Sequence, residues 1–133
     1  MPRPINKPAY FENITYKIIG AAFAVHKELG PIHKEPVYQK ALENELVLHE
    51  IDYKREVRLP VTYKGKSVGV YIPDFIIDNK VILEVKALPF LPITSSSQLS
   101  YYLKSTGFYV GLLINFGATR LQVRRRIYGS ITC

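Results

Sequence analysis

The chain has 133 residues, of which 47% are hydrophobic and 22% charged, and this balance is typical of one globular domain and excludes a disordered polar segment. Lysine and arginine total 18 against 11 acidic residues, so the formal net charge of +7 favours a polyanionic partner. The single cysteine, Cys133, excludes an intrachain disulfide and indicates a reducing, cytoplasmic compartment, and no apolar run approaches the ~18 residues that a membrane helix needs.

The N-terminus is predicted to lie outside the folded core. Residues 2–8 hold three prolines and two cations, a composition that does not support a regular helix because proline lacks a backbone donor. Residues 1–12 are therefore expected to form a flexible basic arm. The remaining residues, 13–133, are expected to form a single domain, since they contain no linker, repeat or low-complexity stretch.

Two helices are predicted after this arm. Apolar residues recur every three or four positions over residues 14–29, which indicates one buried helical stripe. Gly30 is followed by a proline, and this pair is a helix stop with a physical reason. A second helix is expected to begin near Glu35, where Pro36 suits the first turn, and to run to about His49.

The pattern then becomes that of strands. Residues 53–63 are rich in β-branched and aromatic side chains, and the turn at 64–66 leads into a second expected strand over 68–77. A further turn at 78–80 leads into a third strand at 81–86. Because these connections are short, the sequence predicts a three-stranded antiparallel meander.

The C-terminal part is predicted to hold one helix and two strands. The serine-rich residues 94–97 offer N-caps for a helix over residues 97–105, which Gly107 would end. Strands are expected near 109–115 and 121–128. The predicted order is α-α-β-β-β-α-β-β, and the expected fold class is α+β with a mixed sheet flanked by helices.

The third strand carries charged side chains in an apolar run. Side chains alternate along a strand, so Glu84 and Lys86 share one face while Leu83 and Val85 share the other. Burying a carboxylate and an ammonium without partners is costly, so the strand must open onto a polar cleft or pair the two groups. A structural salt bridge between them is the alternative to a functional site.

Asp74 supplies the second carboxylate. A hairpin that turns near residue 79 places Asp74 alongside Glu84, and two converging carboxylates are the oxygen ligands that Mg²⁺ or Mn²⁺ prefers. A neighbouring Lys86 is suited to orient or deprotonate an attacking water and to offset negative charge on a phosphoryl transition state. The sequence therefore predicts a metal-dependent site for phosphodiester chemistry.

The spacing of these residues resembles a known signature. Pro73-Asp74, nine intervening residues and then Glu84-Val85-Lys86 are similar to the PD-(D/E)xK signature of restriction-type and RecB-type nucleases. Motifs on both flanks are similar to the largely uncharacterised GxxExxY family, which is usually placed in that superfamily. These motifs are Ile-Ile-Gly-Ala-Ala at 18–22, Leu-Gly-Pro at 29–31, Glu35-x-x-Tyr38, Gln98-Leu99-x-x-Tyr102-Leu103 and Gly-Leu-Leu-Ile-Asn-Phe at 111–116.

The resemblance implies a restriction-endonuclease-like core and a Mg²⁺- or Mn²⁺-dependent nuclease that acts on DNA or RNA, with DNA preferred. The catalytic residues that it implies are Asp74, Glu84, Lys86, Glu35 and Gln98. The positions that it implies at the metal are Asp74, Glu84, Val85 and Glu35. Tyr38 and Tyr102 are expected to contact nucleic acid. One departure is Ile32, which stands where the GxxExxY family has its name-giving glycine.

Three arginines near the C-terminus form the most basic stretch of the chain. Arg124, Arg125 and Arg126 are expected to contact phosphates, although a charged edge that discourages strand aggregation explains them equally well. A core of this size is also expected to form a homodimer around a duplex. Two further functional classes stay open from the sequence: a nucleic-acid-binding module without turnover, and an accessory subunit that binds protein.

Overall fold

The structure, a computed structural model, describes residues 8–128 and confirms the α+β class. Its helices and strands, in chain order, are α1 (Pro8–Leu29), α2 (Glu35–Leu48), β1 (Tyr53–Arg55), β2 (Leu59–Tyr63), β3 (Lys66–Tyr71), β4 (Phe75–Ile77), β5 (Val81–Lys86), α3 (Ile93–Thr106), β6 (Val110–Asn115) and β7 (Gln122–Ile127). Within the described residues, no helix combines the length and the apolar character needed to cross a membrane.

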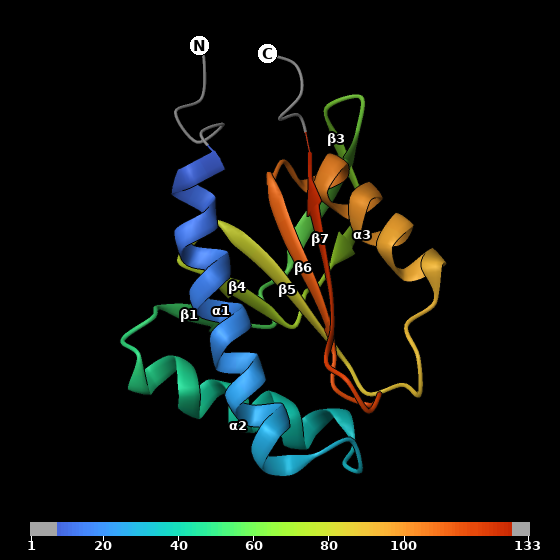
Figure 1. Ribbon diagram of the computed structural model, residues 1–133. Helices are drawn as coiled ribbons and strands as arrows, with labels where there is room; N and C mark the ends of the chain where they lie inside the picture. The colour runs from blue at the N-terminus through green and yellow to red at the C-terminus, as the bar shows by residue number, and fades with distance from the viewer. Residues whose placement is uncertain (1–7, 129–133) are drawn as a thin grey trace.

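The centre of the fold is a five-stranded mixed sheet in the order β1-β4-β5-β6-β7. Strands β5 and β6 are parallel and connected through α3, whereas the other neighbouring pairs are antiparallel. Strands β2 and β3 form a separate two-stranded hairpin. Figure 1 shows α1 and α2 on one side of the sheet and α3 with the hairpin on the other, so the molecule has three layers.

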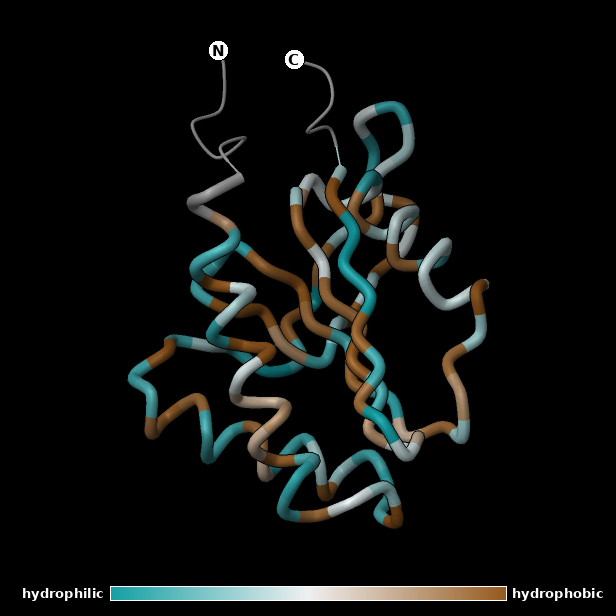
Figure 2. Tube along the Cα trace, in the orientation of Figure 1, coloured by the Kyte–Doolittle hydropathy of each residue, from teal (hydrophilic) through white to brown (hydrophobic). Residues whose placement is uncertain are grey.

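Each face of the sheet has its own core. On the α1 and α2 side the odd-numbered residues of β5, Val81, Leu83 and Val85, join the larger hydrophobic cluster. On the α3 side Ile82 packs in the smaller cluster with residues of α3 and the hairpin. In Figure 2 the central strands are accordingly coloured as hydrophobic. The predicted alternation of β5 is confirmed, and it leaves Glu84 on the α3 side.

The ends of the helices agree with the predictions in part. Helix α1 ends as predicted before Gly30, which has a φ of +72°. It begins at Pro8, however, inside the stretch expected to be an arm, because proline is tolerated in a first helical turn. Residues 1–7 lie outside the described residues. Helix α3 begins at Ile93, four residues earlier than predicted, and its N-cap is Pro92 rather than a serine or threonine.

The two long predicted strands are each divided in the structure. Residues 53–63 split into β1 and β2 at Glu56, whose φ of 53° breaks the extended backbone. Residues 68–77 split into β3 and β4 on either side of Pro73, which has no N–H for a ladder. The antiparallel meander is therefore β1-β4-β5, and the hairpin is inserted between β1 and β4.

Two tight turns are confirmed. Lys64 and Gly65 join β2 to β3 with positive φ angles of 49° and 80°. Asp78 and Asn79 join β4 to β5 with φ angles of 52° and 57°. Such paired positive angles match the right-handed twist of a hairpin. The second turn also fixes the register of β4 against β5, and this register decides which residues meet at the site described next.

Candidate active site

Two carboxylates meet where β4 begins and β5 ends. Phe75 lies opposite Leu83 in the antiparallel ladder, so Asp74 extends the same register to Glu84. The backbone N–H of Asp74 donates a hydrogen bond of 3.3 Å to Glu84 Oε1. The predicted juxtaposition of Asp74 and Glu84 is therefore present in the structure.

The Asp74 carboxylate is held from its own strand and from the next. The backbone N–H of Val85 donates to Asp74 Oδ2 at 2.8 Å, which turns the carboxylate toward β5. Arg55 Nε donates to the Asp74 carbonyl oxygen at 2.7 Å, and Arg55 Nη2 donates to Gln39 of α2 at 3.1 Å. Both the side chain and the backbone of Asp74 are thus fixed before any ligand binds.

Glu84 lies in a largely desolvated position beside an aromatic pair. The hydroxyl of Tyr71, at the end of β3, donates to Glu84 Oε2, and the Tyr71 ring stacks on Tyr102 of α3 with ring centroids 3.8 Å apart. Burial raises the pKa of Glu84 to about 7. The negative charge of Asp74 adds to this increase, whereas the hydrogen bond from Tyr71 opposes it. Burial and the charge of Glu84 also raise the pKa of Tyr71, which keeps the hydroxyl a donor.

Lys86 completes the strand motif without pairing to Glu84. Among residues 8–128, no ion pair joins these two side chains, so the structural salt bridge that the sequence left open is not formed. The Lys86 carbonyl oxygen accepts from the backbone N–H of Phe116 at 2.8 Å, which anchors the end of β5 to β6. Lys86 is half-buried and follows Glu84 by two positions, so it lies on the same side of the sheet as Glu84.

Glu35 approaches the same site from the first turn of α2. Burial and the negative charge of Asp74 raise the pKa of Glu35, and the positive charge of Lys86 partly offsets this. Glu35 is therefore within electrostatic range of Asp74 and Lys86, although it belongs to α2 and they belong to the sheet. The predicted association of Glu35 with the site is consistent with the structure.

A buried asparagine, which the sequence did not single out, fixes the chain beyond Lys86. Asn115 Oδ1 accepts from the backbone N–H of Leu88 at 2.8 Å, and Asn115 Nδ2 donates to the Leu88 carbonyl at 2.9 Å and to Gln122 at 2.8 Å. Its signals in the sequence were its place in the Gly-Leu-Leu-Ile-Asn-Phe motif at 111–116 and a polar residue at the end of an apolar strand. Tyr71 gave no signal, because its contact with Glu84 exists only after the hairpin has packed.

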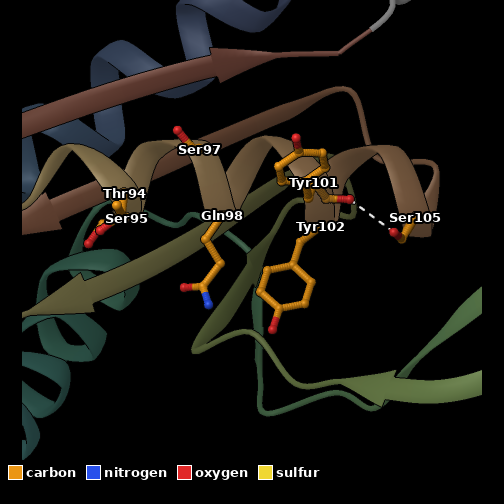
Figure 3. A pocket seen from close by; sticks show the side chains of 7 residues that line it. All are labelled: Thr94, Ser95, Ser97, Gln98, Tyr101, Tyr102 and Ser105. Carbon is orange, nitrogen blue, oxygen red and sulfur yellow. Dashed lines mark hydrogen bonds between the residues drawn. The ribbon is translucent and has the colours of Figure 1, made fainter.

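Gln98 and Tyr102 lie on one side of α3, beside a polar hollow of about 570 Å³. Figure 3 shows both side chains pointing the same way from the helix, whereas Ser97 points away from them. Tyr102 also stacks on Tyr71, which donates to Glu84, so this residue links the hollow on α3 to the surroundings of the site. Tyr102 is therefore near the site through Tyr71, whereas the role of Gln98 stays a prediction.

Tyr38 is not placed to contact nucleic acid, and this prediction is corrected. Its side chain is 0% exposed and stacks on Phe116 with centroids 4.7 Å apart. Its hydroxyl donates to the Gly30 carbonyl oxygen and accepts from the His33 backbone N–H. Tyr38 therefore closes the loop between α1 and α2 as part of the core.

The three consecutive arginines, which the sequence predicts to contact phosphates, do not all face the same side of the sheet. Arg125 lies opposite Leu112 and faces α1, whereas Arg124 and Arg126 lie opposite Leu113 and Gly111 and face the α3 side. Only Arg124 and Arg126 share the side of the sheet that holds Glu84 and Lys86.

Comparison with known proteins agrees with this geometry. A profile of the PD-(D/E)XK nuclease superfamily matches residues 12–127. The chain belongs to this superfamily. A solved structure titled "Crystal structure of SSO0001" is similar in fold, with a TM-score of 0.52 and 22% identity over 69% of this chain. This chain spans about half, 48%, of that one. No curated protein gives a significant match.

PD-(D/E)XK nucleases generally use divalent metal ions, and the donor chemistry here suits one. Crowding of desolvated carboxylates raises the pKa of both Glu84 and Glu35, and a cation among them would relieve that repulsion. In the described part of the chain, no three His, Cys, Asp or Glu residues are grouped closely enough to form a complete ligand set. Asp74 and Glu84 would hold the ion, and a phosphate and waters would complete its shell.

Proposed function

We propose that this superfamily member is a metal-dependent nuclease that hydrolyses phosphodiester bonds in DNA or RNA. The observation that carries the proposal is the convergence of Asp74 and Glu84 where β4 begins and β5 ends, with Lys86 two positions further along β5 on the same side of the sheet. A bound divalent ion would polarise the scissile phosphate and lower the pKa of a coordinated water. The charge of +7 favours a polyanionic substrate.

The side chains of this site have separate parts in the proposed reaction. Asp74 and Glu84 hold the ion, with the Val85 backbone and Glu35 beside them. Lys86 orients the attacking water and offsets negative charge on the phosphate as the transition state forms. Water adds to phosphorus, the bond to the leaving oxygen breaks, and the products carry a terminal phosphate and a terminal hydroxyl. Gln98 lies at the wall of the adjoining hollow, where it is suited to position the substrate.

Cleavage of end-labelled DNA and RNA in Mg²⁺ or Mn²⁺ tests this proposal. The variant Lys86→Ala should lose at least ~100-fold in rate, since it removes a charge that acts on the transition state. The matched control is Lys40→Ala, because Lys40 is exposed on α2 and lies outside the site. The nuclease proposal is wrong if Lys86→Ala cuts every substrate as fast as the parent protein.

A nucleic-acid-binding module without turnover is the second candidate. It is favoured by the lack of a three-residue acidic ligand set among residues 8–128. Salt-dependent binding of nucleic acid without cleavage in any divalent metal would select it. We also propose membership of the GxxExxY family within the superfamily, supported by Glu35-x-x-Tyr38 and Gln98-x-x-x-Tyr102, while Ile32 departs from its pattern.

A further inference from the structure

Charge is divided unevenly along the chain. Residues 1–56, which include α1, α2 and β1, hold eight lysines and arginines and eight acidic residues. Residues 57–133 hold ten lysines and arginines and three acidic residues, so they carry the whole excess of +7. Two of those three acidic residues are Asp74 and Glu84 themselves. The excess positive charge therefore belongs to the half of the chain that includes the hairpin, α3 and the last two strands.

The β2–β3 hairpin is the part of this basic half that is most open to solvent. Residues 57–73 include Arg58, Lys64 and Lys66 and no acidic residue, and every residue from 62 to 70 is exposed. Figure 1 shows the turn of the hairpin standing clear of the helices. With so little of the tip buried, its composition is not explained by the core.

An exposed aromatic ring and two lysines lie together at the tip of the hairpin. Tyr63 is 63% exposed, and Lys64 Nζ lies 5.4 Å from the centre of its ring. Lys66 lies directly opposite Tyr63 in the ladder, so the two side chains emerge on the same face. A large exposed ring next to two lysines of the same tip matches a flat base with neighbouring phosphates.

The base of the same hairpin is part of the site. Tyr71, the last residue of β3, donates to Glu84 and stacks on Tyr102. From Lys66 to Tyr71 the strand advances by five residue steps, about 17 Å at the usual strand rise. A strand stacked as in duplex DNA, with a rise of 3.4 Å per nucleotide, covers that length in about five nucleotides. One strand of nucleic acid is therefore long enough to reach the tip and the carboxylates together.

We propose that the β2–β3 hairpin binds a single strand of nucleic acid. A base stacks on Tyr63, and Lys64 and Lys66 bind phosphates. The inference rests on the proposed function, because it takes the phosphate at Asp74 and Glu84 as the other end of the same strand. A nucleic acid fits better than an anionic membrane. The tip presents one exposed ring next to two lysines, and the hairpin leads directly to a phosphodiester-type site.

Binding measured under conditions that prevent cleavage tests whether the hairpin binds a single strand. The probe is a fluorescently labelled 12-nucleotide single strand in EDTA, and the readout is fluorescence anisotropy over a range of salt concentrations. The charge variant is Lys64→Asn with Lys66→Gln, since asparagine tolerates the positive φ of residue 64. Its matched control is Lys27→Gln with Lys40→Gln, two exposed lysines of α1 and α2.

The charge variant loses two phosphate contacts on a single strand. The slope of log affinity against log salt concentration should therefore become shallower by about 1.4, and binding at 0.1 M salt should weaken about 25-fold. The control should change the affinity by less than about threefold, since its lysines lie outside the basic half. Tyr63→Ala should weaken binding by about fivefold or more, because it removes a stacking surface. Tyr63→Phe keeps the ring and should bind like the parent protein.

Three results would overturn the inference: no binding by the parent protein, tip variants that bind like it, or a control double variant that loses as much affinity. Tip variants that keep oligonucleotide binding but lose binding to phosphatidylserine vesicles would assign the tip to lipid instead. Far-ultraviolet circular dichroism and melting temperature establish that each variant is folded. Because Lys86→Ala reports on cleavage and the tip variants report on binding, the two proposals can fail separately.

Discussion

Replacing Glu84 by glutamine should make the stability of the metal-free protein less dependent on pH. The pKa of Glu84 is raised from 4.5 to about 7, mainly because the carboxylate is buried. Between these values the folded protein binds a proton that the unfolded chain has released, so the free energy of unfolding falls as pH rises. The stabilising effect of the proton is complete below about pH 4.5 and is lost as pH passes 7.

The size of the effect follows from the shift. Each pKa unit corresponds to about 1.4 kcal/mol, so a shift from 4.5 to about 7 lowers the free energy of unfolding by about 3 kcal/mol across that range. In Glu84→Gln this loss is absent because glutamine does not ionise. The substitution also disturbs the hydrogen bond from Tyr71, but that cost does not vary with pH and cancels when the two pH profiles are compared.

Urea unfolding followed by circular dichroism, in EDTA from pH 5 to pH 8, measures both profiles. Relative to the variant, the parent protein should lose most of those 3 kcal/mol over this range, and Mn²⁺ should restore stability to the parent protein at pH 8. If the two profiles run parallel, Glu84 does not titrate with a raised pKa. The reasoning from burial and carboxylate crowding would then be wrong.

Three further substitutions test the surroundings of the site. Tyr38→Phe removes two hydrogen bonds to the backbone before α2 and should cost about 1–2 kcal/mol of unfolding free energy without changing nucleic-acid affinity. Asn115→Ala removes the bonds that hold Leu88 and should cost about 2–4 kcal/mol in urea unfolding. Gly117→Ala places a methyl group into the Leu88 backbone and should cost roughly 3 kcal/mol or more. Its control Gly20→Ala, with nothing within 4 Å, should be neutral or stabilising by melting temperature. Equal melting temperatures of Gly117→Ala and Gly20→Ala would contradict the argument that Gly117 has no room for a methyl group.

Local signals in the sequence determined much of the fold. The end of α1 at Gly30 and the turn at Asp78 and Asn79 require backbone conformations that few residue types adopt. Both can therefore be predicted from the local sequence alone. The same turn fixes the register of β4 against β5, and register with strand alternation was enough to bring Asp74 to Glu84. These parts of the site depend on contacts between residues close in sequence.

The tertiary structure alone decided which surfaces Arg125, Tyr38 and Tyr71 face. The sequence treated Arg124, Arg125 and Arg126 alike, and only the packing of α1 and α3 on opposite sides of the sheet separated Arg125 from the other two. The burial of Tyr38 depends on Phe116, and the contact of Tyr71 with Glu84 depends on a hairpin folded away from the main sheet. A sequence pattern gives the period of a segment and its turns, whereas partners far apart in the chain are chosen by the packing of the whole core.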